Sequence, residues 1–481
     1  MNEIILDSVH EWLIDFQKTF EECIEARDAA ALMNAEESIF RAVLKLADTL
    51  FGLVLESILE DTDWASAANE EMRERVPGMR SKGFRTTPVR LLGGSVINVQ
   101  TPYWVPNRQR NAGRRRRVGK RGKAGVGLYP LLATLGIFIG VTPALQAEVA
   151  RQVTESTSFD VAQANLNARG IDLDRKTTRR IAYGLADRAL DYRDAMLEGR
   201  VSVPNEQMLN GKRVVVCTDG GRYRQRVPAK AGRKRTKTRR RRFKAQWREP
   251  KAFVIYIIDD KGRKMCNALS PLADATTGNA DKTFELLVGY LRAYGAKDAK
   301  EIVFASDGAH WIWDRIPSLV SQLGIDPARV HEVIDFYHAL EHLTTAADLR
   351  SNWTKCERKK WLKCQRRRLK AGKVELVIAA IDELCVGRKA KQFARERDYF
   401  ISNSERMRYA EFRSLAIPCG SGAIESAIRR IVNLRLKGNG IFWREENAER
   451  VLHMRANLKV GRWREMVLNS LHLLPLNQRH A

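Results

Sequence analysis

Three acidic residues stand in short motifs whose composition suits metal-dependent phosphoryl transfer. The motifs are VVVCTDGG around Asp219, IVFASDGAHW around Asp307 and GSGAIESAIRR around Glu425. Carboxylate oxygens are ligands that Mg²⁺ prefers. Two such ions held about 4 Å apart can stabilise the attacking and the leaving oxygen of an in-line displacement. We therefore predict that these three carboxylates are catalytic and bind two magnesium ions.

Buried strands must place the two aspartates. Each Asp closes a run of apolar, β-rich residues, at 213–219 and 301–307, a pattern typical of strands covered on both faces. If the two strands are neighbours, the carboxylates lie side by side at one edge of the sheet. Taken singly, an Asp that follows a strand is also a common turn former or helix cap. The prediction therefore depends on the combination of motifs.

Glu425 is predicted to lie in the first turn of a helix that follows a Gly-Ser-Gly turn. Arg429 comes four residues later on the same helix face, with Arg430 beside it. This spacing would place phosphate-binding cations next to a metal-binding carboxylate. A Glu at a helix start that forms a simple salt bridge gives the same spacing, so spacing alone leaves both interpretations open.

Asp335 and His338 form a further motif, DFYHALEH, between the second Asp and the Glu. The His could contact the scissile phosphate or orient a metal-bound water, and Asp335 could support it or join the metal ligands. The alternative is a buried structural His. A zinc site made from His338 and His342 would need further ligands that the sequence does not offer.

The set CTDGG, ASDGAHWIW, DFYHALEH and GSGAIES resembles the catalytic core of bacterial insertion-sequence transposases with a DDE site. It is most similar to the Mutator-like branch, which includes the Kra-type elements, over roughly residues 120–465. The resemblance implies an RNase-H-like mixed α/β sheet with a large all-α insertion, here at about 340–415. It also implies preceding helical and helix-turn-helix DNA-binding regions.

The resemblance assigns the three metal-binding carboxylates to Asp219, Asp307 and Glu425, and it matches Asp335 and His338 to the family's C/D-x-x-H motif. The implied cofactor is a pair of Mg²⁺ or Mn²⁺ ions. The implied reaction is hydrolysis that frees the 3′ ends of a transposon, followed by attack of these ends on target DNA. The implied partners are double-stranded transposon-end DNA, target DNA, and further copies of the chain in a homodimer or higher oligomer.

The charge of the chain independently favours a polyanionic partner. Lys and Arg number 84 against 57 Asp and Glu, which gives a net charge of +27. The charge is clustered in two runs, 107–123 and 230–248, and the second holds eleven Lys or Arg and no acid. Such runs are often solvated faces, but runs that flank a carboxylate site favour DNA contact, which would weaken steeply with salt.

A helix-turn-helix pattern supplies further candidate DNA contacts. A first helix is predicted from Phe159 to Arg169, Gly170 forms the turn, and a second helix begins near Asp174 or Lys176. Such a second helix can enter a major groove, although packing of a helical pair gives the same pattern. The candidate DNA-binding residues are Arg114, Arg115, Arg116, Arg117, Lys176, Thr177, Arg179, Arg180, Arg239, Arg240, Arg241, Arg242, Trp311, Arg429 and Arg430.

The predicted organisation follows from these patterns. It consists of an N-terminal helical domain (1–80), a small β hairpin with a basic arm (81–125), a helix-turn-helix-like DNA-binding domain (126–205), a first part of the catalytic core (206–338) with a basic hairpin inserted at 228–250, a helical insertion domain (339–416), and a second part of the core with the Glu helix and C-terminal helices (417–481).

Several features predict a cytoplasmic, nucleoid-associated protein without membrane contact. The seven cysteines include no C-x-x-C pair, which favours a reducing compartment. The uncharged stretch 124–147 is interrupted by prolines, and its apolar centre of 11 residues, 131–141, predicts a buried helix that is too short to span a bilayer.

Two other functions fit part of the sequence. An RNase-H-like DNA endonuclease or resolvase would cut DNA without joining ends. A non-catalytic regulator derived from a transposase would keep the basic runs and the helix-turn-helix, but it would not require intact acidic motifs.

Overall fold

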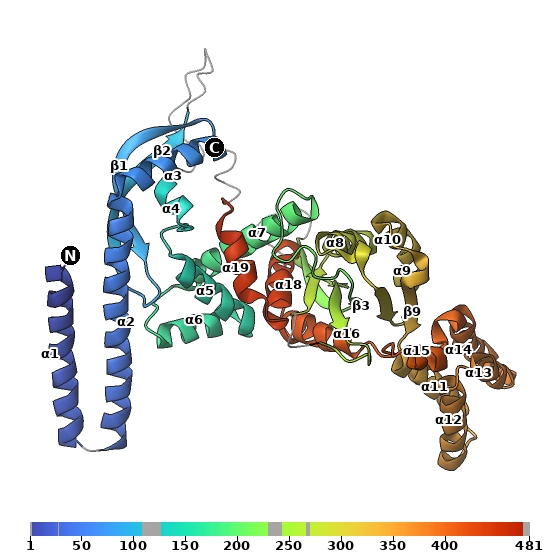
Figure 1. The fold of residues 1–481 in the computed structure, drawn as a ribbon. Helices are drawn as coiled ribbons and strands as arrows, with labels where there is room; N and C mark the ends of the chain where they lie inside the picture. The colour runs from blue at the N-terminus through green and yellow to red at the C-terminus, as the bar shows by residue number, and fades with distance from the viewer. Residues whose placement is uncertain (1, 27, 108–126, 229–242, 266–269, 475–481) are drawn as a thin grey trace. The chain divides into compact units, whose positions relative to one another are not determined.

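A computed structural model describes residues 2–26, 28–107, 127–228, 243–265 and 270–474 (Figure 1). The chain divides into two compact units. The first consists of Met1–Tyr192 together with Arg464–Ala481, and the second consists of Arg193–Trp463. The C-terminal residues thus group with the N-terminal unit, whereas the sequence analysis assigned them to the core.

The first unit begins with a hairpin of two long helices, α1 (Asn2–Ala26) and α2 (Ala29–Glu60), that pack against each other. The Asp28 side chain caps α2, because it accepts a hydrogen bond from the Ala31 N–H at 2.8 Å and so satisfies a donor that every helix start leaves free. α3 (Thr62–Arg75) follows. The helical character of this region, predicted from apolar residues three and four apart, is confirmed.

Two strands form the antiparallel hairpin predicted after these helices, β1 (Met79–Arg90) and β2 (Val96–Pro106). The turn between them is attached to α2 by a buried carboxylate. Asp48 accepts hydrogen bonds from the N–H groups of Gly93 and Ser95, each at 2.9 Å. The C-terminal half of α2 is therefore fixed to the β hairpin by a charge-assisted interaction.

The uncharged stretch 124–147 is not the single buried helix that its composition suggested. α4 (Pro130–Thr134) ends after little more than one turn, and α5 begins at Pro143 and runs to Glu155. Gly136 and Gly140, between the two helices, have φ values of 69° and 68°, which a right-handed helix cannot include. Residues on both sides of the break are buried: Leu131, Leu132, Ile137, Phe138 and Val141. The apolar composition therefore reflects a core position and not a long helix.

The helical pair predicted as a helix-turn-helix consists of α6 (Phe159–Ala168) and α7 (Arg175–Leu197). Asp174 caps α7 by accepting hydrogen bonds from the N–H groups of Lys176 and Thr177. The chain leaves the first unit and enters the second near the end of α7. None of the helices in the described ranges combines the length and the apolar character that a bilayer crossing requires.

In the second unit, five strands of the described residues form one mixed sheet in the order β7–β6–β3–β8–β9. The central strand β3 (Arg213–Gly220) is antiparallel to β6 (Lys251–Ile258) and parallel to β8 (Glu301–Ser306). β9 (Val330–Ile334) pairs with β8 in parallel, and β7 (Leu272–Thr276) pairs with β6 in antiparallel fashion. The two apolar runs predicted as strands, 213–219 and 301–307, are confirmed, and the fold is mixed α/β with a mixed sheet.

Two more strands, β4 (Tyr223–Pro228) and β5 (Phe243–Arg248), pair with each other beyond β3, where the sequence predicted a basic hairpin. Helices connect the strands of the main sheet. They are α8 (Ala280–Ala293), η1 (Ala296–Asp298), α9 (His310–Trp313), α10 (Ile316–Leu323) and η2 (Pro327–Arg329).

After β9 the chain is helical over the predicted insertion, and it then returns to the sheet. The insertion contains α11 (Phe336–Leu349), α12 (Lys355–Lys370), α13 (Val374–Asp382), η3 (Gly387–Lys389), α14 (Ala390–Ser402), η4 (Ser404–Met407) and α15 (Tyr409–Ser414). The returning segment contains α16 (Gly422–Ala427), the π-helical turn η5 (Ile428–Asn433), α17 (Leu434–Leu436), α18 (Glu445–Lys459) and α19 (Trp463–Leu471). α16 packs on β3 and β6, and α18 packs on β7.

A buried charge network joins β7 to α7, α8 and α18. Asp274 accepts a hydrogen bond from the Tyr290 hydroxyl at 3.0 Å, and it lies 3.0 Å from His453 Nδ1 and 3.4 Å from Arg193 Nη1. Arg193 also pairs with Glu449 at 3.3 Å. Burial alone would raise the pKa of Asp274, but His453 and Arg193 outweigh it and lower this pKa to about 2. The fold around β7 therefore depends on a paired, fully desolvated carboxylate.

Candidate catalytic carboxylates

The aspartates of the first two motifs lie at the same level of adjacent parallel strands. β3 and β8 keep a constant offset of 88 residues, from the Arg213–Glu301 ion pair to the hydrogen bond between the Thr218 N–H and Ser306 Oγ. The next residues at this offset are Asp219 and Asp307. Asp219 is therefore the penultimate residue of β3, where it still pairs with Ala252 of β6, and Asp307 directly follows β8. Both lie at the carboxyl ends of neighbouring strands, as the sequence predicted.

Asp219 is the most perturbed carboxylate of the site. Burial, with smaller contributions from the charges of Asp307, Glu249 and Glu425, raises its pKa to about 6, against one hydrogen bond accepted from the Gly220 N–H at 2.6 Å. A carboxylate responds in this way only to like charges that lie nearby. The three carboxylates chosen from the sequence therefore share one electrostatic site, although up to two hundred residues separate them in the chain.

Asp307 is held by the turn that it starts. Its Oδ1 accepts a hydrogen bond from the Ala309 N–H at 3.0 Å, and its backbone carbonyl accepts one from Trp313 Nε1 at 2.7 Å. Trp313 is buried, whereas Trp311 is partly exposed and packs edge-on against Phe284. The tryptophans of this motif thus support the turn, and Trp311 retains an accessible part.

Glu425 lies in α16, in the first turn as predicted, and is exposed. Partial burial and the charges of Asp335 and Glu341 raise its pKa, while His338 lowers it. The helix that carries it continues as η5, whose carbonyls at Arg430 and Ile431 accept hydrogen bonds from the buried Arg455 guanidinium. Such π-helical turns occur often at functional sites.

Asp335 positions the Glu-bearing helix. Its Oδ1 caps α11 by accepting hydrogen bonds from the N–H groups of Tyr337 and His338 at 2.6 and 3.2 Å. Its Oδ2 accepts the Ser421 N–H at 2.5 Å and also the Ser421 hydroxyl. Because four hydrogen bonds occupy both oxygens of this buried carboxylate, the geometry favours a positioning role over metal binding.

His338, which was predicted to act together with Asp335, is partly exposed. Its Nδ1 lies 3.4 Å from Glu341 Oε2 and its ring meets His342 edge-on at 5.1 Å. His342 does not join it in a metal site, since it pairs with Glu396 at 2.6 Å and stacks on Tyr399 with ring centres 3.6 Å apart. His338 therefore remains the histidine available to a substrate phosphate.

Two residues not predicted from the sequence pack on the glycines that follow the candidate aspartates. Glu249 packs on Gly220 so closely that a side chain at position 220 would collide with its carboxylate. Tyr399, from the helical insertion, packs on Gly308 in the same manner, and burial together with the charges of Asp307 and Asp335 raises its pKa. For Glu249 the only signal in the sequence is that it is an isolated acidic residue beside a basic run. The sequence gives no signal for Tyr399.

The predicted DNA-binding residues are partly placed. Lys176, Arg179 and Arg180 are exposed on α7, whereas the Thr177 hydroxyl donates to Asp174 at 2.6 Å and serves the cap. Arg429 and Arg430 are exposed next to Glu425. Eight predicted arginines lie outside the described residues: Arg114, Arg115, Arg116, Arg117, Arg239, Arg240, Arg241 and Arg242.

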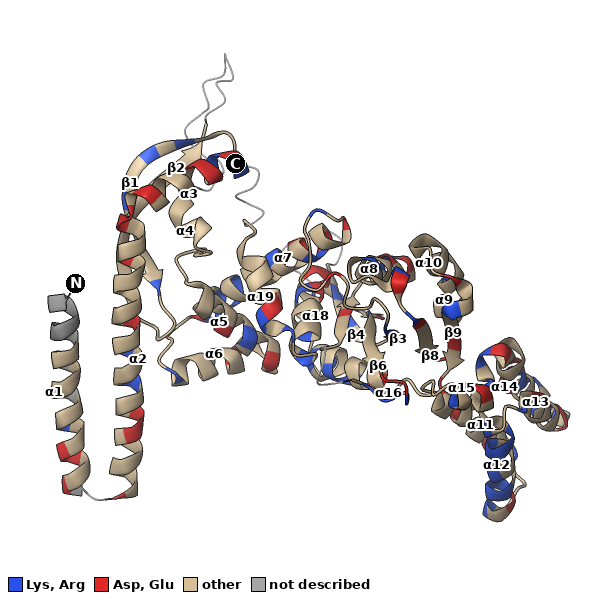
Figure 2. Cartoon of the chain, viewed as in Figure 1, with Lys and Arg blue, Asp and Glu red and all other residues tan. Residues whose placement is uncertain are grey.

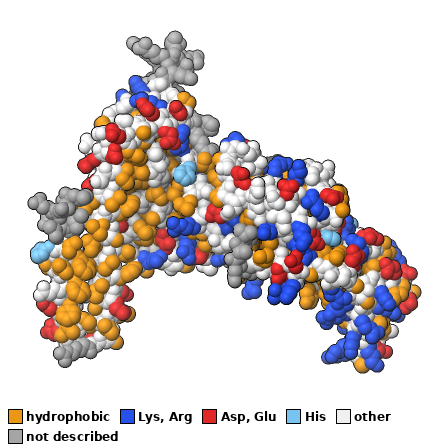
Figure 3. All heavy atoms as spheres, viewed as in Figure 1, with side chains coloured by type: hydrophobic (Ala, Val, Ile, Leu, Met, Phe, Trp, Pro, Cys, Tyr) orange, Lys and Arg blue, Asp and Glu red, His pale blue; other side chains and the backbone are white. Residues whose placement is uncertain are grey.

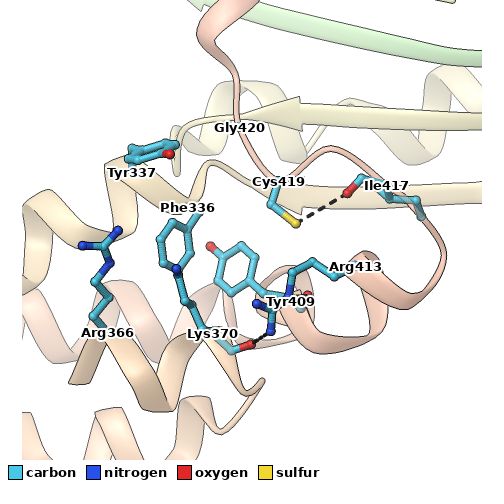
Figure 4. Close-up of a pocket in the computed structure, with 9 residues that line it drawn as sticks. All are labelled: Phe336, Tyr337, Arg366, Lys370, Tyr409, Arg413, Ile417, Cys419 and Gly420. Atoms are coloured by element: carbon cyan, nitrogen blue, oxygen red, sulfur yellow. Dashed lines mark hydrogen bonds between the residues drawn. The ribbon is translucent and has the colours of Figure 1, made fainter. Parts of the chain in front are cut away.

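A basic helix that was not among the predicted site residues lies in the insertion. α12 carries nine Lys or Arg and one Glu over Lys355–Lys370, and its ribbon in Figure 2 is mostly in the colour of Lys and Arg. Beside its C-terminal end is a cavity of about 310 Å³ that reaches Gly420, next to the Ser421 turn. Figure 4 shows the aromatic and cationic side chains that line it, which include Phe336, Tyr337, Arg366, Lys370, Tyr409 and Arg413.

The donor set fits divalent metal ions. Asp219, Asp307 and Glu425 offer only oxygen ligands, as Mg²⁺ and Mn²⁺ prefer. Burial is the main cause of the raised pKa of Asp219, and a bound cation would offset the smaller contribution from the charges of Asp307 and Glu425. In the described ranges no three His, Cys, Asp or Glu side chains are close enough together to hold an ion. Binding would therefore require the side chains to move toward one another.

Comparison of the chain with family models, curated proteins and solved structures finds no match.

Proposed function

We propose that the chain is a DDE transposase of the bacterial insertion-sequence type, with an RNase-H-like catalytic core. The observation that carries the proposal is the placement of Asp219 and Asp307 at the same level of two adjacent parallel strands, in one electrostatic site with Glu425. The strand order supports it as well, because β6 and β7 follow β3 with antiparallel pairings on one side and β8 and β9 follow it with parallel pairings on the other, which gives the mixed sheet that the resemblance implies.

Asp219, Asp307 and Glu425 would hold two Mg²⁺ or Mn²⁺ ions. These ions would supply activation of a water or a DNA 3′-hydroxyl and neutralise charge on the scissile phosphate. Arg429 and Arg430 present cations to the same phosphate region from the helix that carries Glu425. His338 lies near enough to Glu425 to lower its pKa, and Asp335 keeps α16 in place through Ser421.

The proposed substrate is double-stranded DNA, both transposon ends and target. Among the described residues, α12 and the exposed Lys176, Arg179 and Arg180 of α7 provide the cations for phosphate contacts. The aromatic rings of the cavity beside α12 offer stacking surfaces for bases at the cleavage point. Such a protein would act in the cytoplasm on nucleoid DNA, as a dimer or larger assembly.

The test is cleavage and joining by the purified full-length chain. The substrate is supercoiled plasmid that carries the chromosomal DNA flanking the coding sequence, incubated with Mg²⁺ or Mn²⁺. We expect metal-dependent nicking and joined products, and loss of both in Asp219→Asn, Asp307→Asn and Glu425→Gln. Asp260→Asn is the matched control, because Asp260 is exposed and pairs only with Lys300 in the described structure.

The outcomes separate the alternatives. Nicking without joined products would indicate an endonuclease or resolvase and would reject the transposase. Binding without any metal-dependent nicking would indicate a non-catalytic regulator. Near-normal nicking by any one of the three carboxylate variants would remove that residue from the proposed catalytic set.

A further inference from the structure

The helical hairpin α1–α2 exposes large apolar side chains along its length. Figure 3 shows the hydrophobic atoms gathered over these two helices. Every one of the side chains concerned is between 36% and 58% exposed. They are Leu13, Ile14, Phe16, Phe20, Ile24, Leu32, Met33, Ile39, Phe40, Val43, Leu50, Phe51 and Val54. We call this set the exposed seam.

The spacing of the exposed seam is that of a coiled coil. On α2, Met33, Phe40, Val43, Leu50 and Val54 follow one another at intervals of three, four or seven residues. This is the a and d pattern by which one helix packs side chains between those of another. The residues of α2 that are already buried within the chain lie elsewhere, at Ala35, Asp48, Gly52 and Leu55. The exposed seam is therefore an additional packing surface.

The area of the exposed seam is that of a stable protein interface. At roughly 100 Å² of exposed surface for each large side chain, its 13 members present on the order of 1,000 Å². A standard interface takes about 800 Å² from each partner, and exposed apolar patches on monomers reach only about 300–600 Å². The hairpin thus offers enough apolar surface for a dimer.

The charge of the hairpin excludes DNA as the occupant. Residues 1–60 contain 13 Asp or Glu and four Lys or Arg, a net charge of −9 in a chain whose net charge is +27. An acidic segment repels the DNA backbone. A helical protein surface with the same spacing is the partner that the exposed seam fits.

We propose that the exposed seam binds the exposed seam of a second copy of this chain, so that two hairpins form a four-helix bundle. A surface of this kind is self-complementary when two copies are related by a twofold axis. Asp48 fixes the C-terminal half of α2 to the β1–β2 turn, so the bundle would also hold the β hairpins of the two copies. The proposal concerns assembly and does not depend on the nuclease activity.

The test is the molar mass of the purified full-length chain, freed of DNA, in high salt by light scattering and sedimentation. We expect the wild type to have about twice the chain mass of 54.8 kDa. Phe40→Glu combined with Leu50→Glu should give a monomer. Leu376→Glu combined with Ile401→Glu is the matched control, since these two residues are equally exposed in the second unit, and it should remain a dimer.

Phe40→Ala provides a milder variant that keeps the hairpin helical. Because a dimer loses two buried aromatic rings, its dissociation constant should rise by about 100-fold or more. A wild-type chain that is monomeric at micromolar concentration would overturn the proposal, as a heterologous partner would then be required. A Phe40→Glu/Leu50→Glu variant that stays dimeric with wild-type helicity by circular dichroism would overturn it too.

Discussion

The Asp335 carboxylate accepts two hydrogen bonds from one residue, the backbone N–H and the hydroxyl of Ser421, across 86 residues of chain. Phe336 N–H also donates to the Cys419 carbonyl at 2.8 Å in the same place. The end of β9 is therefore joined to the turn that starts the Glu425 helix. This junction allows Glu425, which follows the long helical insertion, to contribute to the same site as Asp219 and Asp307 at the ends of β3 and β8.

Removal of the Ser421 hydroxyl should weaken catalysis more than folding. Ser421→Ala loses one of the four hydrogen bonds to Asp335, which costs about 1 kcal/mol of stability. The looser Glu425 helix should lower metal-dependent nicking by about tenfold, as for other residues that orient metal ligands. Nicking rates at several Mn²⁺ concentrations and a thermal melt measure the two effects. Ser421→Thr keeps the hydroxyl and should restore the rate; equal rates in all three proteins would reject the positioning role.

Asp219→Asn should abolish nicking and yet stabilise the metal-free protein. The folded pKa of Asp219 is raised to about 6, so the folded state binds the proton more tightly than the unfolded chain does. Ionisation of Asp219 therefore lowers the stability of the folded state. The whole of this loss is present above about pH 6, and none of it is present below about pH 4. We expect a gain of about 1–3 kcal/mol at pH 7 that fades as pH falls through this window. Urea unfolding at pH 4 and pH 7 is the measurement, and a loss of stability at pH 7 would contradict the assignment.

Asp274→Asn should have the opposite effect, with large destabilisation at neutral pH. The change leaves Arg193 buried with one anionic partner fewer, and breaking a buried pair in this way costs about 3–5 kcal/mol. The wild type should lose about 2–3 kcal/mol of stability as pH falls from about 4 to about 2, because the folded pKa is depressed to about 2. Thermal unfolding of both proteins at pH 7 tests this, with exposed Asp260→Asn as the control.

Neutralising α12 should reduce DNA affinity and its dependence on salt. Arg366, Arg367 and Lys370 are exposed on this helix, and each phosphate contact that is lost should lower the slope of log K against log salt by about 0.9. The triple change to Gln is compared with Lys297→Gln/Lys300→Gln, which removes exposed cations elsewhere on the second unit. Fluorescence anisotropy with duplex DNA at several salt concentrations gives the slopes. An unchanged slope in the α12 variant would show that this helix does not contact phosphates.

The sequence was sufficient for the parts of the fold that depend on local composition. Runs such as VVVC before Asp219 and IVFA before Asp307 are apolar and β-branched because both faces of the sheet are covered, and each is a strand. The helix start predicted near Asp174 also follows from local hydrogen bonding. The order of the sheet made the two aspartates neighbours, as expected.

The features that the sequence did not reveal depend on contacts between distant segments. β7 has the short, mixed sequence LADAT, and its buried Asp274 is tolerated only because Arg193 and His453 surround it. Glu249 and Tyr399 pack on the glycines that follow the candidate aspartates, and no local pattern marks these contacts. The break between α4 and α5 was also missed, although Pro143, which begins α5, is visible in the sequence.

The packing of Tyr399 against Gly308 makes the insertion and the sheet interdependent in evolution. A larger residue at position 308 would displace the ring, and a shorter insertion would remove the wall beside Asp307. Related chains should therefore change these two positions together, and an insertion transplanted from another protein should work only when its own partner for residue 308 comes with it.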